Sequence, residues 1–190
     1  MMLTERYQIV RRRDAKGLFH AVEDASGRVL ILSELDELSR APLQTGSRRY
    51  LDCMLGDEAP PRNSGPAIRP QYLHLSRERI PLTFLDTALE IGAIEDARVI
   101  APGHVPHTIG FALLGTVVLY DTVLADLAWR ALQEGLFGGL CMSLLEWRDP
   151  AGLFTSGELQ HVILGDRESS HLANARVLRL REELLPPISR

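Results

Sequence analysis

The clearest pattern of apolar positions in the chain predicts an amphipathic helix that starts near Asp121-Thr122. One face of this helix collects apolar residues at three- and four-residue spacing, namely Leu124, Leu127, Ala128, Ala131 and Leu132. Asp121 or Thr122 can cap the helix, because either side chain offers an oxygen to the exposed amides of the first turn. Gly135 follows where helices commonly end in a left-handed residue, so we expect the helix to end there.

Short runs rich in aliphatic, β-branched and aromatic residues predict strands on both sides of this helix. The predicted strands are Tyr7 to Val10, Leu18 to Val22, Val29 to Leu32, Tyr72 to Leu75, Ile80 to Leu85, Phe111 to Tyr120, Leu136 to Trp147 and Glu158 to Leu164. Ser33 to Ser39 has its leucines three apart and predicts a short helix. Leu172 to Leu185 is expected to begin extended and to end as a helix before Pro186-Pro187.

A polar, proline-rich stretch from Gly56 to Pro70 divides these elements into two groups. Its prolines are Pro60, Pro61, Pro66 and Pro70, and it is typical of a linker or a long surface loop. We therefore expect a β-rich N-terminal lobe over residues 1–70, ending in this stretch, and a second domain over residues 71–190.

Composition narrows the class of protein. The 190 residues are 45% hydrophobic and 24% charged, as in a folded globular protein, and no run approaches the length needed to span a bilayer. The net charge of −4 and the short basic run Arg11-Arg12-Arg13 argue against a nucleic-acid partner. The first residues lack the apolar run of a secretory signal. Cys53 and Cys141 form no disulfide framework, so a cytoplasmic protein without membrane contact is expected.

Cys141 is the candidate residue for covalent chemistry. It follows Gly138-Gly139 in a predicted strand, and because side chains alternate across a strand, it shares a face with Ser143 and Leu145. Exposed amides near these glycines would suit an oxyanion. A thiol nucleophile also needs a nearby imidazole, since the thiolate is the reactive species. By itself, a cysteine in a strand is more often a small buried hydrophobic residue.

The segment from Asp121-Thr122 to Leu144 resembles the core of the tailed-phage prohead proteases, which mature the capsid. In that family an Asp-Thr helix start leads through a helix ending in glycine to a strand of the form Gly-hydrophobic-Ser-hydrophobic-Gly-aromatic. Gly139 matches the first glycine of that strand and Cys141 matches its nucleophilic serine. Ser143 stands at the second glycine and Leu144 at the aromatic residue.

The resemblance extends on both sides of this core. His104 precedes Ile109-Gly110 at nearly the spacing of the family's catalytic histidine, with His107 as the alternative. Downstream, His161 to Leu164 and Ala173 to Val177 are similar to two extended segments of the family. The chain also departs from the pattern. Val105 stands where the family often has Asp, His161 replaces a Glu, and residues 1–90 show no match.

The resemblance implies an α+β fold, a mostly antiparallel β-barrel flanked by helices, with the β-rich N-terminal lobe added to it. It also implies an endopeptidase of a phage, prophage or phage-derived system that cuts scaffold or capsid proteins during assembly. Cys141 would be the nucleophile, His104 the base, and amides at Gly138 and Gly139 the oxyanion donors. Herpesvirus-type assembly proteases use a second histidine as the third member of the catalytic triad, and His161 would take that role. Asp121 and Asp126 are the alternatives for the third member. A homo-oligomer without cofactor is expected.

Two other interpretations stay open on the sequence. The protein can be a catalytically inactive relative that keeps the protease fold for a structural or assembly role. Trp129, outside the apolar stripe of the helix, would then mark a contact surface. Alternatively, His104 and His107 have a His-x-x-His spacing that suits zinc, with Cys141 or His161 as a further ligand brought near by the family fold.

Overall fold

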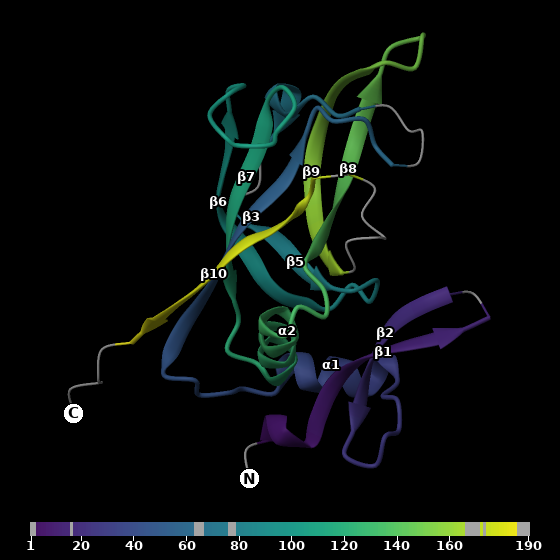
Figure 1. Cartoon of the computed structure of the whole chain (residues 1–190), viewed down its shortest axis with the longest axis vertical. Coiled ribbons are helices and arrows are strands. Elements are labelled where there is room, and N and C mark those ends of the chain that lie inside the picture. Colours follow the sequence, from purple (N-terminus) through teal and green to yellow (C-terminus); the bar gives the residue numbers. More distant parts are fainter. Residues whose placement is uncertain are drawn as a thin grey trace.

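Seven strands of the chain close into a β-barrel (Figure 1). The computed structural model describes residues 3–15, 17–62, 67–75, 79–165, 172 and 174–185. In order around the barrel the strands are β9 (Phe154–Gly165), β5 (Ile80–Phe84), β6 (Glu90–Ile100), β7 (Ala112–Leu119), β3 (Ser47–Asp57), β10 (Arg176–Leu184) and β8 (Gly139–Arg148), and β8 pairs with β9 again. The short β4 (Leu73–His74) flanks β9.

Neighbouring strands of the barrel are antiparallel except β5 and β9, which run parallel to each other. The short β4, outside the seven barrel strands, also runs parallel to β9. The barrel closes where β8 meets β10 at the single pair Gly139–Arg176. Two further bonds extend this contact: Leu140 donates its amide to Ala175 at 3.3 Å, and Val177 donates to Gly138 at 2.9 Å. The expected barrel is therefore confirmed. The protein is mostly β, because only two α-helices accompany the strands in the described residues.

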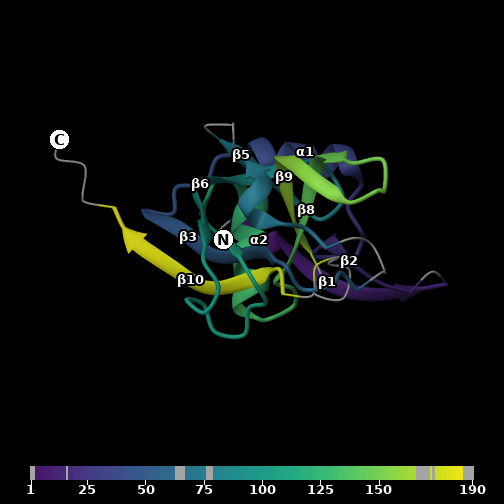
Figure 2. The same ribbon diagram turned by 90° about the horizontal axis from the view of Figure 1, so that it is seen from above.

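Helix α2 (Val123–Gln133) lies at one end of the barrel, with α1 (Leu32–Arg40) beside it (Figures 1 and 2). Thr122 caps α2, since its hydroxyl accepts the amide of Ala125 at 3.4 Å. Gly135 has a φ of +71°, the left-handed conformation that ends the helix. Nearly the whole of α2 is buried, so the helix closes this end of the core. The sequence predicted this element correctly.

The N-terminal hairpin consists of β1 (Tyr7–Asp14) and β2 (Gly17–Asp24), preceded by a 3-10 helix, Leu3–Arg6. Ile9 and Val22 from this hairpin belong to the same hydrophobic cluster as Leu51 and Leu113 of the barrel. β3 is one of the strands that form the barrel, although most of it precedes the proline-rich stretch. A boundary at residue 70 therefore does not separate the two parts.

Parts of the proline-rich stretch are packed against the barrel. Ala59, Ile68 and Pro70 are buried, and Pro70 begins a short 3-10 turn, Pro70–Tyr72, that ends at the exposed Tyr72. Residues 63–66, with Pro66, lie outside the described residues. The stretch is thus a loop of the barrel, and its described parts do not form a linker between two domains.

Two predicted elements differ from the structure. Val29 to Leu32 was expected as a strand, but Val29 makes only an isolated bridge and α1 begins at Leu32. A carboxylate oxygen of Glu34 accepts the amide of Ile31 at 2.9 Å, and this local contact stabilises the helix start. The expected helix near Leu185 is also wrong. β10 continues as a strand to Leu184 because β3 pairs with it residue by residue; Pro186-Pro187 lie outside the described residues.

Trp129 is buried, with 3% of its surface exposed, so it is not a contact surface. The Arg49 guanidinium of β3 lies 5.5 Å from the centre of its ring. Arg49 also donates to Asp126 on α2 at 2.5 Å, and Arg130 lies 3.2 Å from the other oxygen of that carboxylate. This cluster joins α2 to β3. Among the described residues, no helix has the length and apolar character needed to cross a membrane.

Candidate functional site

Strand pairing brings Cys141 and His161 to one face of the barrel wall. Cys141 of β8 lies opposite Ile163 of β9, and Ser143 lies opposite His161. Opposed residues of antiparallel strands project from the same face of a sheet. Leu140 and Val162, on the alternate positions, are buried in the barrel interior. Cys141, Ser143 and His161 therefore lie on the outer face.

Cys141 and His161 are diagonal neighbours in this pairing. Such positions lie about 7–8 Å apart between Cα atoms, a separation that long or aromatic side chains can bridge. The register shifts between Ser143 and Leu144, which marks a β-bulge next to the pair. Bulges increase local twist and re-aim side chains. Both Cys141 and His161 are half-buried, so the thiol and the imidazole are accessible without being freely solvated.

The two cysteines have opposite environments. Cys53 on β3 is 1% exposed, and burial raises the pKa of its thiol far above the usual range. The thiolate of Cys53 is therefore suppressed. Cys141 is half-buried, and its Sγ lies 4.0 Å from the carbonyl oxygen of Met142, a weak contact. Only Cys141 has the access that a nucleophile needs.

This contrast predicts selective alkylation. Iodoacetamide added to the folded protein is expected to modify Cys141 at least about 100-fold faster than Cys53, because Cys53 reacts only through openings of the core. Peptide mass spectrometry after timed quenching measures both rates. Labelling in urea provides the control, since both thiols should then react alike. Equal rates in the native protein would contradict the assignment.

His104 lies in the loop between β6 and β7 rather than on a strand beside Cys141. Its side chain is exposed, and its Nδ1 lies 3.3 Å from the carbonyl oxygen of Pro102 in the same loop. His107 is also exposed and has a φ of +62°. Strand pairing places His161, and not His104 or His107, next to the nucleophile candidate.

The two carboxylates that are the alternatives for the third catalytic residue make hydrogen bonds and ion pairs away from Cys141. Asp121 accepts a hydrogen bond from the hydroxyl of Thr45 at 3.0 Å. Asp126 is buried on α2 between Arg49 and Arg130. Arg49 lies near the start of β3. β8 contacts β10 at Arg176, and Arg176 lies opposite Met54, toward the other end of β3. Both carboxylates therefore serve the packing of α2 rather than the Cys141 face.

The expected oxyanion donors are also occupied. The amide of Gly138 donates to the carbonyl oxygen of Gly165 at 3.2 Å. Gly139 is paired on both sides, with Gly165 of β9 and with Arg176 of β10. A donor already used in the sheet cannot hold an oxyanion without breaking that bond. The structure thus does not offer Gly138 for this role, and it encloses Gly139 within the sheet.

A metal site is not formed by the described residues, which include His104, His107, Cys141 and His161. No three histidine, cysteine, aspartate or glutamate side chains in this part of the chain converge as metal ligands. The separation of the histidine loop from β8 accounts for this, since zinc requires ligands about 2 Å from one point.

A buried carboxylate that the sequence did not single out organises the region between the histidine loop and β8. Asp57, at the end of β3, is 1% exposed. Its oxygens accept three hydrogen bonds: from the amide of Ala59 at 3.2 Å, from the amide of Ile109 at 3.0 Å and from the side-chain amide of Asn174 at 2.8 Å. Asn174 precedes Ala175, whose carbonyl oxygen accepts a hydrogen bond from the amide of Leu140. Asp57 thereby links the loop to the strand that carries Cys141.

The Ile109-Gly110 pair has a packing role in this arrangement. Glu58 accepts the amide of Phe111 at 3.2 Å and donates its own amide to Ile109 at 3.0 Å. Gly110 has a φ of +67°, and a Cβ placed there would meet the carboxylate of Glu58. Only glycine fits this close approach.

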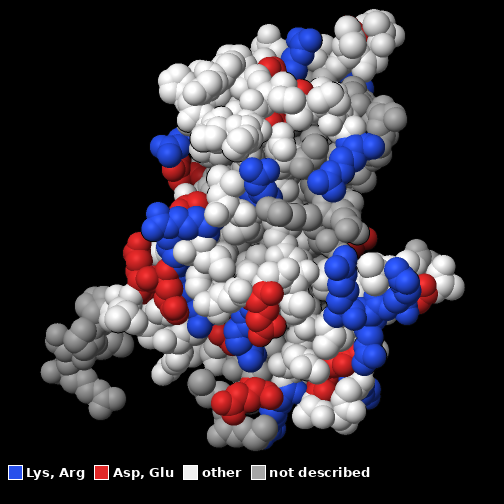
Figure 3. Space-filling view, in the orientation of Figure 1, with Lys and Arg blue, Asp and Glu red and all other residues white. Residues whose placement is uncertain are grey.

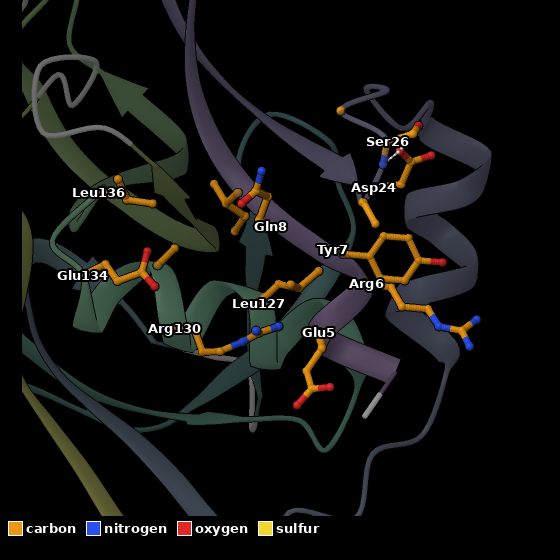
Figure 4. A pocket seen from close by; sticks show the side chains of 14 residues that line it. Glu5, Arg6, Tyr7, Gln8, Asp24, Ser26, Leu127, Arg130, Glu134 and Leu136 are labelled. Atoms are coloured by element: carbon orange, nitrogen blue, oxygen red, sulfur yellow. Dashed lines mark hydrogen bonds between the residues drawn. The ribbon is translucent and has the colours of Figure 1, made fainter. Parts of the chain in front are cut away.

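A separate hollow of about 560 Å³ lies between the N-terminal hairpin and α2 (Figure 4). Tyr7, Asp24, Arg130 and Glu134 are among its lining residues, whereas Cys141 and His161 are not. The hollow is therefore distinct from the Cys141 face.

Comparison with protein-family models, with curated proteins and with solved structures gives no match.

Proposed function

We propose that the protein is a cysteine endopeptidase of the capsid-maturation type, with Cys141 as nucleophile and His161 as its base. The observation that carries this proposal is the placement of the two side chains, half-buried, as diagonal neighbours on the outer face of β8 and β9. A thiol and an imidazole that can reach each other form the minimal unit of nucleophilic acyl transfer.

The reaction needs two chemical steps from this pair. His161 takes the proton of Cys141 as Sγ attacks the peptide carbonyl, and then gives that proton to the leaving amine as the C–N bond breaks. His161 next removes a proton from water, which attacks the thioester and releases the acid and the free thiol. A bulge beside the pair supports the proposal, because bulges aim side chains at functional sites.

The substrate class rests on the resemblance of residues 104–177 to the prohead proteases. Scaffold or capsid proteins of a phage, a prophage or a phage-derived system are the proposed substrates. The barrel and the helix–glycine–strand unit around α2 and β8 agree with what that resemblance implies for the fold. They do not by themselves identify a substrate.

Two observations favour a second candidate, an inactive relative with a structural or assembly role. His104 is exposed and bonded within its own loop, and Gly138 is used by the sheet. Two of the groups that the resemblance implies for catalysis are thus not assembled around Cys141. A non-enzymatic protein would keep the barrel and bind the same scaffold or capsid proteins without cutting them.

Co-expression of the full chain with the scaffold and capsid genes of its own genomic neighbourhood distinguishes the two candidates. An endopeptidase is expected to generate new N-termini on the scaffold or capsid protein, which mass spectrometry of the products identifies. Pre-treatment of the purified protein with iodoacetamide should abolish cleavage in the reconstituted mixture. Uncut but co-purifying scaffold or capsid protein favours the structural role and overturns the peptidase.

A further inference from the structure

The second edge of β10 is open over most of its length. β3 pairs with β10 from Ser47 to Met54, but β8 contacts β10 only at the pair Gly139–Arg176. In the described part of the chain no strand covers that edge beyond this pair. β10 also extends away from the body of the molecule (Figures 1 and 2). An uncovered strand edge is a template for pairing with another strand.

The backbone groups of three residues point toward this open edge. Leu185 donates its amide to Gly46 at 2.9 Å, on the β3 side. Alternate residues of an antiparallel strand direct their backbone groups to opposite edges. The pairing of β10 with β3 has no register shift after Arg179. Leu180, Glu182 and Leu184 therefore direct their amides and carbonyls away from β3.

The side chains along this edge are self-complementary in antiparallel order. If two copies of β10 pair about a two-fold axis at Arg181, Arg179 of each copy lies opposite Glu183 of the other. Leu178 then lies opposite Leu184, and both are exposed, at 45% and 86%. The edge-directed residues Leu180 and Glu182 face each other, as the hydrogen-bonding pattern requires.

The charge at the centre of this register is already neutralised. Arg181 makes a paired contact with Asp52, its Nε 2.9 Å and its Nη2 3.0 Å from the two carboxylate oxygens. Two copies of Arg181 can therefore approach with little repulsion. The register centred on Glu182, whose carboxylate already lies 3.2 Å from Arg49 of its own chain, would instead leave Arg179 opposite Leu185 and lose the pairing of Arg179 with Glu183. Acidic and basic side chains lie next to one another over β3 and β10 (Figure 3).

A groove next to β10 gives the exposed Leu184 a place to bind. This groove has a volume of about 400 Å³ and runs along Val177 to Leu180. Leu132, Leu136 and Phe137 are among its lining residues. In the register about Arg181, Leu184 of the second copy reaches the level of Leu178, at this groove. Its burial there would remove from water a side chain that is 86% exposed in the single chain.

We infer that the chain forms a two-fold symmetric dimer by antiparallel pairing of β10 with β10 of a second copy. Arg179 of each chain pairs with Glu183 of the other, and Leu184 of each chain enters the groove beside β10 of the other. The contact uses neither Cys141 nor His161, so it is independent of the proposed peptidase activity.

Sedimentation velocity over a dilution series tests this dimer with charge-reversal variants of the full chain. Arg179→Glu and Glu183→Arg each place two like charges at both ends of the contact, so each is expected to weaken dimerisation about tenfold or more. The combined variant Arg179→Glu/Glu183→Arg restores opposite charges and should dimerise like the unaltered protein. Leu184→Asp should weaken the dimer as well, because it places a carboxylate in the groove.

Arg40→Glu on α1 is the matched control, since it makes the same charge change at an exposed position that neither pairs with β10 nor lines the groove beside it. Circular dichroism verifies that each variant is folded, as substitutions at exposed positions rarely unfold a protein. A dimer that the single reversals weaken and the combined reversal restores supports the inference. A monomer at every concentration, single reversals without effect, or a combined variant that stays as weak as the single ones overturns it.

Discussion

Replacing Cys141 with alanine is expected to abolish cleavage of scaffold or capsid protein, with a loss of at least about a thousandfold in rate. The reason is that the proposed reaction passes through a thioester on Sγ, which alanine cannot form. Cys141 is half-buried on the outer face, so the loss of one sulfur atom there should leave the fold intact. Product formation is followed by mass spectrometry of new N-termini.

Cys53→Ala is the matched control for this experiment. It removes the other thiol of the chain, which is buried in the barrel and whose pKa burial raises. Cleavage by Cys53→Ala at the unaltered rate, together with none by Cys141→Ala, assigns the reaction to Cys141. His161→Ala should also lower the rate, by about 10²- to 10⁴-fold. Full activity in Cys141→Ala would rule out the thiol mechanism.

Replacing Asp57 with alanine is expected to lower the free energy of unfolding by about 3–5 kcal/mol. The carboxylate is buried and accepts hydrogen bonds from Ala59, Ile109 and Asn174. Alanine would leave these three donors without an acceptor in a place that water does not readily reach, and each lost bond is costly. Urea denaturation followed by circular dichroism measures the change.

Asp52→Ala provides the comparison on the same strand. Asp52 pairs with Arg181, and both side chains are about a third exposed, at 31% and 30%. Ion pairs that solvent reaches stabilise by about 0–1 kcal/mol, so this variant should unfold at nearly the urea concentration of the unaltered protein. If Asp57→Ala is no more destabilised than Asp52→Ala, Asp57 does not organise the region between the histidine loop and β8.

The segments that could be predicted from the sequence are those whose structure depends on nearby residues. The stripe of α2, a cap at Asp121 or Thr122 and a left-handed Gly135 all depend on contacts within one helix. The structure confirms the stripe and Gly135, and it shows that Thr122 is the cap. The alternation in β8 likewise places Cys141 and Ser143 on one face whichever strand pairs with β8. Patterns of spacing carry this information because they reflect the geometry of the local backbone.

Contacts between distant segments depend on how the strands pair in the folded barrel. The pairing of Ser143 with His161 depends on a bulge and on a register that no local pattern specifies. β10 stays extended to Leu184 because β3 supplies its hydrogen bonds. Asp57 meets Ile109 and Asn174 only when the barrel closes. Local spacing is enough to specify which residues form α2 and which residues share a face of β8 with the thiol. The barrel determined which histidine lies beside that thiol, because strand register is a property of the whole sheet.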